Sequence, residues 1–350
     1  MRSENPGVLV LYNVPRSEDS AGKSPFAESE AGVLAEVRAV TEAMAKLGTP
    51  HRVVGVRRLS DLPGVLAGAR ERVVFNLVES LRTDAADANL VPTVCRAFGK
   101  ACTGGDTPCL MLAMDKWQSR TALVAHGLAC PAAAVVPVGQ KVRPSVLPAG
   151  RLIVKPAACD GSEGIDPASV VDGPGPDLAR AVRRVHEQLG QPALVEQFVG
   201  RRELNVTLLQ RGGRLETLPL AEIDFSAFAE GKLRIVDYAA KWLSETFEYR
   251  NTPTIIPAPL EEKVARRVRQ SALVAWRALG CQDYARVDFR LNDDGRAFIL
   301  DVNPNPDVSP DAGFAAALVA AGIPYEDFVG SVVRNADSRL AGKTSRDERG

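Results

Sequence analysis

The chain has 350 residues, of which 45% are hydrophobic and 25% are charged, and its 43 basic residues balance its 43 acidic residues. This length suits two or three packed subdomains, and the neutral balance lacks the basic surface typical of proteins that bind nucleic acid or anionic membranes. Because no apolar run reaches the roughly 20 residues that span a bilayer and no signal-peptide pattern opens the chain, we expect a cytoplasmic protein with no nucleic-acid or membrane partner.

The first unit, residues 1–111, alternates strand and helix patterns. Residues 8–12 are expected to form a buried strand. The helix that follows is marked by apolar residues spaced four, three, four and three apart: Val33, Val37, Val40, Met44 and Leu47. Further strands are expected at 52–56 and 73–77. This alternation predicts an α/β protein with a mainly parallel sheet.

The second unit, residues 112–196, contains a strand at 152–155 that ends in Lys155 and is followed by a loop with Gly161, Ser162 and Gly164. Glycines let backbone N–H groups approach phosphate oxygens closely, and a lysine adds a point charge. The loop therefore suggests a phosphate-binding site, with an ordinary turn as the alternative.

Two other nucleotide motifs are excluded. Gly22-Lys23-Ser24 ends like a P-loop, but Ser17 stands where that motif requires its first glycine, and Pro25 follows directly. No Gly-x-Gly-x-x-Gly follows the first strand, which argues against a dinucleotide-binding dehydrogenase.

The third unit, residues 197–337, has strand patterns near 205–210, 218–225, 285–291 and 297–302, with a helical pattern at 261–279. Asn292-Asp293-Asp294-Gly295 predicts a hairpin turn between the last two strands. Residues 338–350 lack apolar periodicity, so we expect a flexible tail there.

The predicted hairpin carries a candidate metal site. Period-two alternation puts Arg286 and Asp288 on one face of the first strand, and Asp301 and Asn303 on one face of the returning strand. Carboxylate and amide oxygens on rigid strands suit Mg²⁺. The alternative is a polar hairpin whose acids are exposed to solvent.

Two segments could complete a nucleotide site. Glu196 ends a strand, and Phe198, Val199 and Glu203 follow it as a possible hinge that meets an adenine and a ribose. A flexible run at 226–231 precedes Lys241 and could be a lid that carries this lysine to the phosphates. Taken singly, each segment can also be an ordinary hinge or surface loop.

In this order along the chain, Asp115-Lys116, Lys155-Pro156, Glu196, Glu203, Lys241, Arg286-x-Asp288 and Asp301-x-Asn303 resemble the ATP-grasp enzymes, most closely D-alanine–D-alanine ligase. The resemblance covers roughly residues 70 to 310. It implies an α/β ATP-grasp fold: an N-terminal parallel α/β lobe, and two α+β lobes that clasp ATP. It also implies a ligase that makes an amide from a small-molecule carboxylate and amine through an acyl phosphate, and a possible homodimer.

The resemblance implies a role for each matching position. Lys116, Lys155 and Lys241 correspond to lysines on the ATP phosphates, the last from the lid. The adenine and ribose contacts correspond to Glu196, Phe198, Val199 and Glu203. Two Mg²⁺ ions, replaceable by Mn²⁺, would be held by Asp288, Asp301 and Asn303. Arg286, Ser162 and Lys241 correspond to catalytic residues of the family. Arg286 would stabilise the acyl phosphate and then the tetrahedral oxyanion that forms when the amine attacks.

Departures from the family pattern concern the substrates. The glycine-rich turn after the first strand is absent, and Trp242 stands where the family usually has a tyrosine. Asp301 replaces the usual glutamate, and Asp307 replaces a common glycine. ATP chemistry is therefore expected, with a substrate pair that can differ from D-alanine. An ATP-grasp kinase or other phosphoryl-transfer enzyme, and a catalytically silent ATP-binding regulator, are the alternatives.

Overall fold

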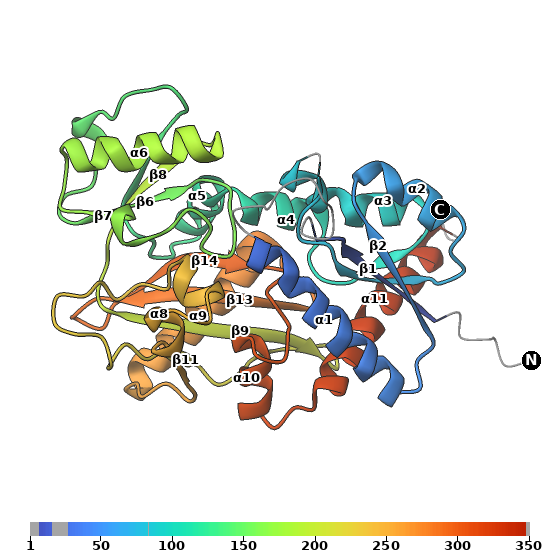
Figure 1. Ribbon diagram of the computed structural model, residues 1–350. Helices are drawn as coiled ribbons and strands as arrows, with labels where there is room; N and C mark the ends of the chain where they lie inside the picture. The colour runs from blue at the N-terminus through green and yellow to red at the C-terminus, as the bar shows by residue number, and fades with distance from the viewer. Residues whose placement is uncertain (1–6, 16–26, 83, 348–350) are drawn as a thin grey trace, which may run out of the picture.

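The computed structural model describes residues 7–15, 27–82 and 84–347, so Gly22-Lys23-Ser24 lies outside the described part of the chain. Three sheets organise the described residues (Figure 1). The first is parallel throughout, with the order β2-β1-β3-β4. Its strands are β1 (Val8–Asn13), β2 (His51–Val56), β3 (Val73–Leu77) and β4 (Ala101–Cys102).

Alternate side chains of β1 enter two different cores, as the period of two requires. Val8 and Val10 pack in a core shared with α1 (Ala27–Lys46) and α11 (Tyr325–Asp347), whereas Leu9 and Leu11 pack in a core shared with α2 and α3. The latter helices are α2 (Leu62–Ala67) and α3 (Val91–Ala97). The first sheet is thus buried on both faces, which is typical of parallel sheets.

The second sheet is antiparallel, with the order β5-β8-β6-β7. Its strands are β5 (Ala133–Val136), β6 (Leu152–Pro156), β7 (Val170–Val171) and β8 (Ala193–Gln197). Apolar residues of α6 (Pro176–Leu189) cover it, and the helix ends at Gly190 in the left-handed conformation (φ 64°). This lobe lies at the upper left of Figure 1.

The third sheet is also antiparallel, with the order β12-β11-β9-β13-β14 and β10 paired to β9. Its strands are β9 (Arg202–Arg211), β10 (Arg214–Thr217), β11 (Ala221–Ile223), β12 (Thr254–Ile255), β13 (Tyr284–Leu291) and β14 (Ala297–Asn303). The short helices α7 (Tyr238–Trp242) and α8 (Phe247–Arg250) lie between β11 and β12 in the chain.

Two sets of helices pack against this third sheet. On one side, α9 (Glu262–Leu279) shares a core with α4 (Thr107–Met114) and α5 (Lys116–Ala125). On the other, α10 (Gly313–Ala320) and α11 share a core with the first sheet. The predicted boundary at residue 111 therefore falls inside α4.

Two expectations need correction. The mainly parallel sheet is confined to the first unit, since the strands of the second and third sheets pair antiparallel with their neighbours. The expected flexible tail from residue 338 is instead helical up to Asp347. Arg339 anchors this helix by donating to both carboxylate oxygens of the fully buried Asp283, at 2.6 and 2.8 Å. A single buried ion pair leaves no trace in an apolar pattern, so this anchor could not be expected from the sequence.

Among the described residues no single helix is both long and apolar enough to cross a bilayer, although α10 and α11 together meet that test across a bend of 105°.

Candidate active site

The β13–β14 hairpin brings together the four side chains expected to share one face. Asp288 pairs with Asp301 and Arg286 with Asn303 in the antiparallel register. The Arg286 guanidinium donates to both oxygens of Asp288, at 2.8 and 3.0 Å. Burial acts to raise the pKa of the Asp288 carboxyl, but Arg286 outweighs it and holds that pKa below its ordinary value. Asp288 is therefore an ionised carboxylate at neutral pH.

A third strand contributes a residue that the sequence analysis missed. Asn205 lies opposite Asp288 on β9 and donates to its Oδ1 at 2.7 Å. Asn303 donates to Oδ2 at 3.2 Å. Each oxygen of Asp288 thus receives two hydrogen bonds, which fixes the carboxylate rigidly before any ligand arrives.

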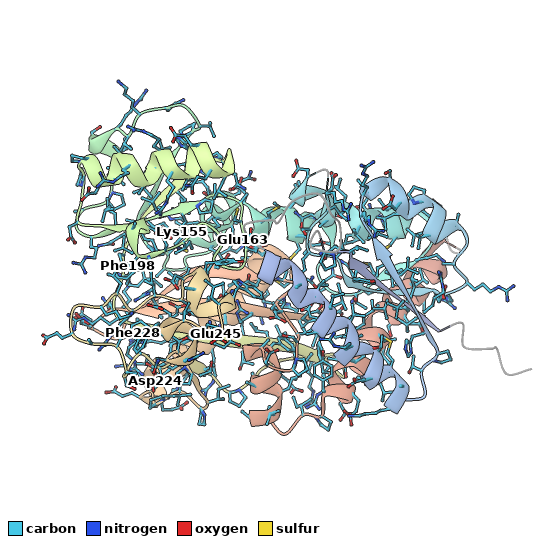
Figure 2. The ribbon with its side chains drawn as sticks, in the orientation of Figure 1. Lys155, Glu163, Phe198, Asp224, Phe228 and Glu245 are labelled. Carbon is cyan, nitrogen blue, oxygen red and sulfur yellow. The ribbon has the colours of Figure 1, made fainter. Side chains whose placement is uncertain are left out.

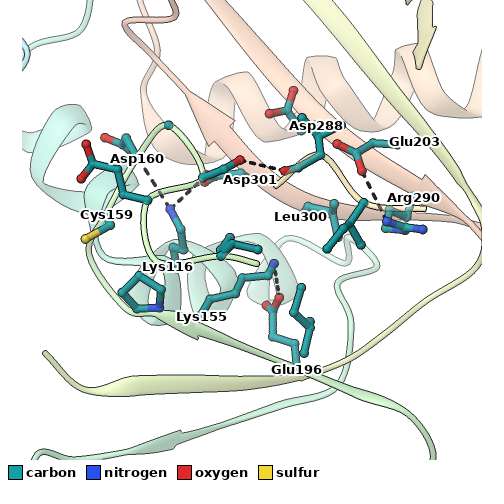
Figure 3. A pocket seen from close by; sticks show the side chains of 18 of the residues that line it. Lys116, Lys155, Cys159, Asp160, Glu196, Glu203, Asp288, Arg290, Leu300 and Asp301 are labelled. Carbon is teal, nitrogen blue, oxygen red and sulfur yellow. Dashed lines mark hydrogen bonds and ion pairs between the residues drawn. The ribbon is translucent and has the colours of Figure 1, made fainter. Parts of the chain in front are cut away.

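Two lysines from the other side of the cleft also form ion pairs (Figure 3). Lys116 begins α5, where the Asp115 side chain caps the helix, and its Nζ lies 3.1 Å from Asp301. Burial acts to lower the pKa of Lys116, but Asp301 and Asp160 outweigh it and hold that pKa above its ordinary value. Lys155 on β6 lies 2.5 Å from Glu196 on the neighbouring strand β8.

Two hydrogen bonds join the glycine loop to the expected lid, the segment that leads into α7 and includes that helix. Ser162 Oγ donates to the Val236 carbonyl at 2.9 Å, and Trp242 Nε1 donates to the Gly161 carbonyl at 2.8 Å. The Trp242 ring also lies close to Gly32 of α1, where an added Cβ would sit 3.3 Å from it. Trp242 therefore touches two other units of the molecule and closes the lid on both.

Lys241 belongs to the lid helix α7 and lines the same cleft as Arg286. Burial and the positive charge of Arg286 lower the pKa of Lys241. A cation held in such a place would gain from an anionic ligand, which would offset both effects.

One cleft of about 880 Å³, counting the part open to solvent, unites these groups where the second lobe meets the third sheet. Lys155 and Phe198 mark this junction in Figure 2. All the site residues expected from the sequence line the cleft: Lys116, Lys155, Ser162, Glu196, Phe198, Val199, Glu203, Lys241, Arg286, Asp288, Asp301 and Asn303. Further lining residues include Cys159, Asp160, Glu163 and Arg290.

Acidic side chains gather near the cationic pair Lys241 and Arg286. The buried Glu36 of α1 accepts a hydrogen bond from the Val308 N–H at 2.7 Å, and burial together with Glu79 and Asp307 raises its pKa well above the ordinary value. Although part of Glu79 is exposed, loss of hydration and the carboxylates of Asp307 and Asp160 raise its pKa to about 8. Asp307 was noted in the sequence because it replaces a glycine that is common in the family.

The fold is that of the ATP-grasp proteins. A crystal structure of D-alanine–D-alanine ligase from Bacillus anthracis complexed with ATP superposes with a TM-score of 0.73, over 96% of this chain and 99% of that chain, at 17% identity. This likeness confirms the expected fold class.

Sequence comparison then gives the family. The model for the D-ala D-ala ligase C-terminus matches residues 145–334. A D-alanine–D-alanine ligase of Cupriavidus pinatubonensis is 32% identical, over 67% of this chain and 68% of the relative. An uncharacterized protein of Sinorhizobium fredii, y4sG, is 29% identical over 77% of this chain and 76% of the relative. The chain belongs to the D-alanine–D-alanine ligase family and is an ATP-grasp carboxylate–amine ligase.

Proposed function

We propose that the chain binds ATP with Mg²⁺ in this cleft and joins the carboxylate of one amino acid-like substrate to the amine of another through an acyl phosphate. The observation that carries the proposal is the convergence of twelve expected side chains on one cleft from separate elements. Lys116 and Lys155 would contact the phosphates from one wall, and Lys241 from the lid. Glu196, Phe198, Val199 and Glu203 would hold the adenine and ribose.

The donor set fits a hard divalent cation. Two carboxylates, Asp288 and Asp301, face each other across paired strands, and the amide of Asn303 adds a carbonyl oxygen. These three side chains would leave the remaining coordination positions to phosphate oxygens and water. Bound there, Mg²⁺ would neutralise phosphate charge, and we expect two such ions, with Mn²⁺ as a substitute.

The chain's own residues account for the remaining chemistry. Arg286 is fixed by Asp288, so its charge is oriented before the oxyanion develops, and a preorganised group of this kind contributes about 3 kcal/mol to lowering the barrier. The lid that Trp242 and Ser162 hold over the glycine loop would exclude water, which otherwise hydrolyses an acyl phosphate. Positioning then lets the amine displace phosphate.

The acids beside Lys241 and Arg286 favour an ammonium-bearing substrate. The carboxylate of Asp307 raises the pKa of Glu79, and a bound cation would relieve that repulsion. Together with Asp307 at a position where the family commonly has a glycine, they support a substrate pair other than two D-alanines. A cytoplasmic location and a homodimer complete the proposal.

A screen of ADP release over D- and L-amino acid pairs, followed by mass spectrometry of the product, tests this function. We expect release that requires both an acid and an amine, and a product that is lighter than their sum by one water. Release with a non-carboxylate acceptor alone would instead indicate a kinase. Binding of Mg·ATP without turnover on any acceptor would indicate a silent regulator. Hydroxylamine distinguishes the ligase from the kinase, because it traps the acyl phosphate that the ligase forms as a hydroxamate.

A further inference from the structure

Arg290 on β13 is a buried arginine in the wall of the cleft, with only 4% of its surface exposed. Its Nε donates to the Val199 carbonyl at 2.8 Å, and its Nη2 donates to the Gly200 carbonyl at 3.1 Å. Its guanidinium carbon lies 4.6 Å from the centre of the Phe198 ring. One side chain therefore holds three consecutive residues of the hinge.

The same guanidinium reaches two further parts of the site. Nη1 lies 3.4 Å from the Glu203 carboxylate, the group assigned to the ribose, and Nη2 also donates to the Arg234 carbonyl at 2.8 Å. Arg234 stands four residues before the lid helix α7. A planar group with five donors can serve such divergent acceptors at once, whereas a lysine ammonium has only three donors at one point.

The hinge depends on this docking because its backbone approaches β13 very closely. A Cβ at Gly200 would lie 1.7 Å from the Leu291 carbonyl oxygen, and Gly200 has a positive φ of 55°. Only glycine permits the approach, and Arg290 then satisfies the carbonyls that the approach brings against the strand.

We propose that Arg290 is a positioning residue that couples the base and ribose end of the nucleotide site to closure of the lid over the phosphates. The proposal rests on the proposed function, since it takes ATP as the ligand. One buried cation, Arg290, contacts the Phe198–Gly200 segment, the Glu203 carboxylate and the start of the lid. Order in the hinge therefore favours order in the lid, and the reverse. Arg290 itself need not touch the reacting atoms.

The test compares Arg290→Met with Arg202→Met, a matched control from the same sheet. Like Arg290, Arg202 contacts a carboxylate and donates to a backbone carbonyl. Two of its nitrogens donate to Glu222 and one of them also donates to Pro259, but Arg202 does not line the cleft. Hydrogen exchange of the full chain is measured with and without Mg·ATP over residues 198–203 and 234–242. Binding of ATP is measured by calorimetry.

In the wild-type protein and the control, ATP should slow exchange in both segments. In Arg290→Met, exchange should be faster in both segments before ATP is added, and ATP should then protect 198–203 without protecting 234–242. The Kd for ATP should rise about 10- to 100-fold, the range expected for losing hydrogen bonds to a charged group. Arg290→Lys keeps the charge beside Glu203, so it should restore most of the ATP affinity but not the protection of the lid.

A pH profile separates this role from general destabilisation. Burial raises the pKa of Glu203, and Arg290 opposes that shift. Asp288 also raises this pKa, whereas Lys155 and Lys241 lower it, and these groups are the same in both variants. Without Arg290 the Glu203 carboxyl should stay protonated to higher pH, so the Kd for ATP of Arg290→Met should improve as pH rises, by more than that of Arg202→Met.

Unchanged exchange of residues 234–242 and a Kd for ATP within twofold of wild type in Arg290→Met would overturn the inference. If that variant does not fold, protection of residues 234–242 by ATP in Arg290→Lys to the same extent as in the wild type would overturn it. If the wild-type protein fails to bind ATP, the proposed function falls, whereas the exchange of the ligand-free proteins still decides whether Arg290 joins the two segments.

Discussion

The two ends of the cleft differ in how their charges are arranged. At the nucleotide end, three cations each lie against an acid: Lys116 with Asp301, Lys155 with Glu196, Arg286 with Asp288. At the other end Glu36, Glu79 and Asp307 crowd together, and the pKa values of the two glutamates are raised. The ion pairs hold the side chains of the nucleotide end in place before a ligand binds. At the other end, the repulsion between the crowded acids would be relieved by a positively charged substrate.

The largest expected effect comes from breaking the paired end. Asp288→Asn should reduce the rate of ADP release by roughly 10³-fold, because it removes a metal ligand and weakens the carboxylate contact that orients Arg286. Circular dichroism should show an intact fold, since the residue lies on a strand held by both neighbours. Asp293→Asn in the hairpin turn is the control. Near-normal turnover of Asp288→Asn would remove the metal site from the account.

Arg286→Lys should have the next largest effect. We expect kcat to fall about 10²- to 10³-fold, the usual result of removing one preorganised oxyanion donor, while the KM for ATP changes little. Steady-state kinetics at saturating ATP measure both quantities. Arg296→Lys, in an arginine that lies over Phe298 near the hairpin turn, serves as the control. A rise in KM with kcat unchanged would assign Arg286 to ATP binding instead.

Glu36→Gln tests the crowded end through stability. The folded chain holds the Glu36 proton above the ordinary pKa of 4.5, whereas the unfolded chain releases it, so this group's contribution to stability is present below pH 4.5 and is lost as pH rises. Each unit by which the pKa is raised costs about 1.4 kcal/mol of stability above the folded pKa. The unfolding midpoint of the wild type should therefore fall as pH rises above 4.5, and that of Glu36→Gln should fall less. Parallel curves would show that Glu36 ionises normally.

The smallest expected effect concerns the lid. Trp242→Phe keeps a ring against Gly32 but removes the hydrogen bond to Gly161, worth about 1 kcal/mol. Because the lid excludes water, ATP hydrolysis in the presence of the acid alone should rise about fivefold. Trp117→Phe, in a partly exposed tryptophan of α5, should hydrolyse ATP like the wild type. Equal hydrolysis in both variants would show that Trp242 does not hold the lid.

The same contrast explains what could be predicted from the sequence. Asp288 and Asp301 were predictable because a hairpin turn brings their strands together locally, and the lysines because they stand in motifs that resemble a family. Asn205 and Glu36 were not, because their partners lie 83 and 272 residues away and each looks like an ordinary polar residue in its own segment. Local patterns determined the elements, whereas contacts between distant elements completed the site.

Transfer of ¹⁸O tests the central claim, activation of a carboxylate by phosphorylation, most directly. The acid substrate identified by the amino acid screen is labelled with ¹⁸O in its carboxylate, and the released phosphate is analysed by mass spectrometry. An acyl phosphate predicts one ¹⁸O atom in phosphate for each amide formed. Unlabelled phosphate accompanying a normal yield of amide would contradict the account.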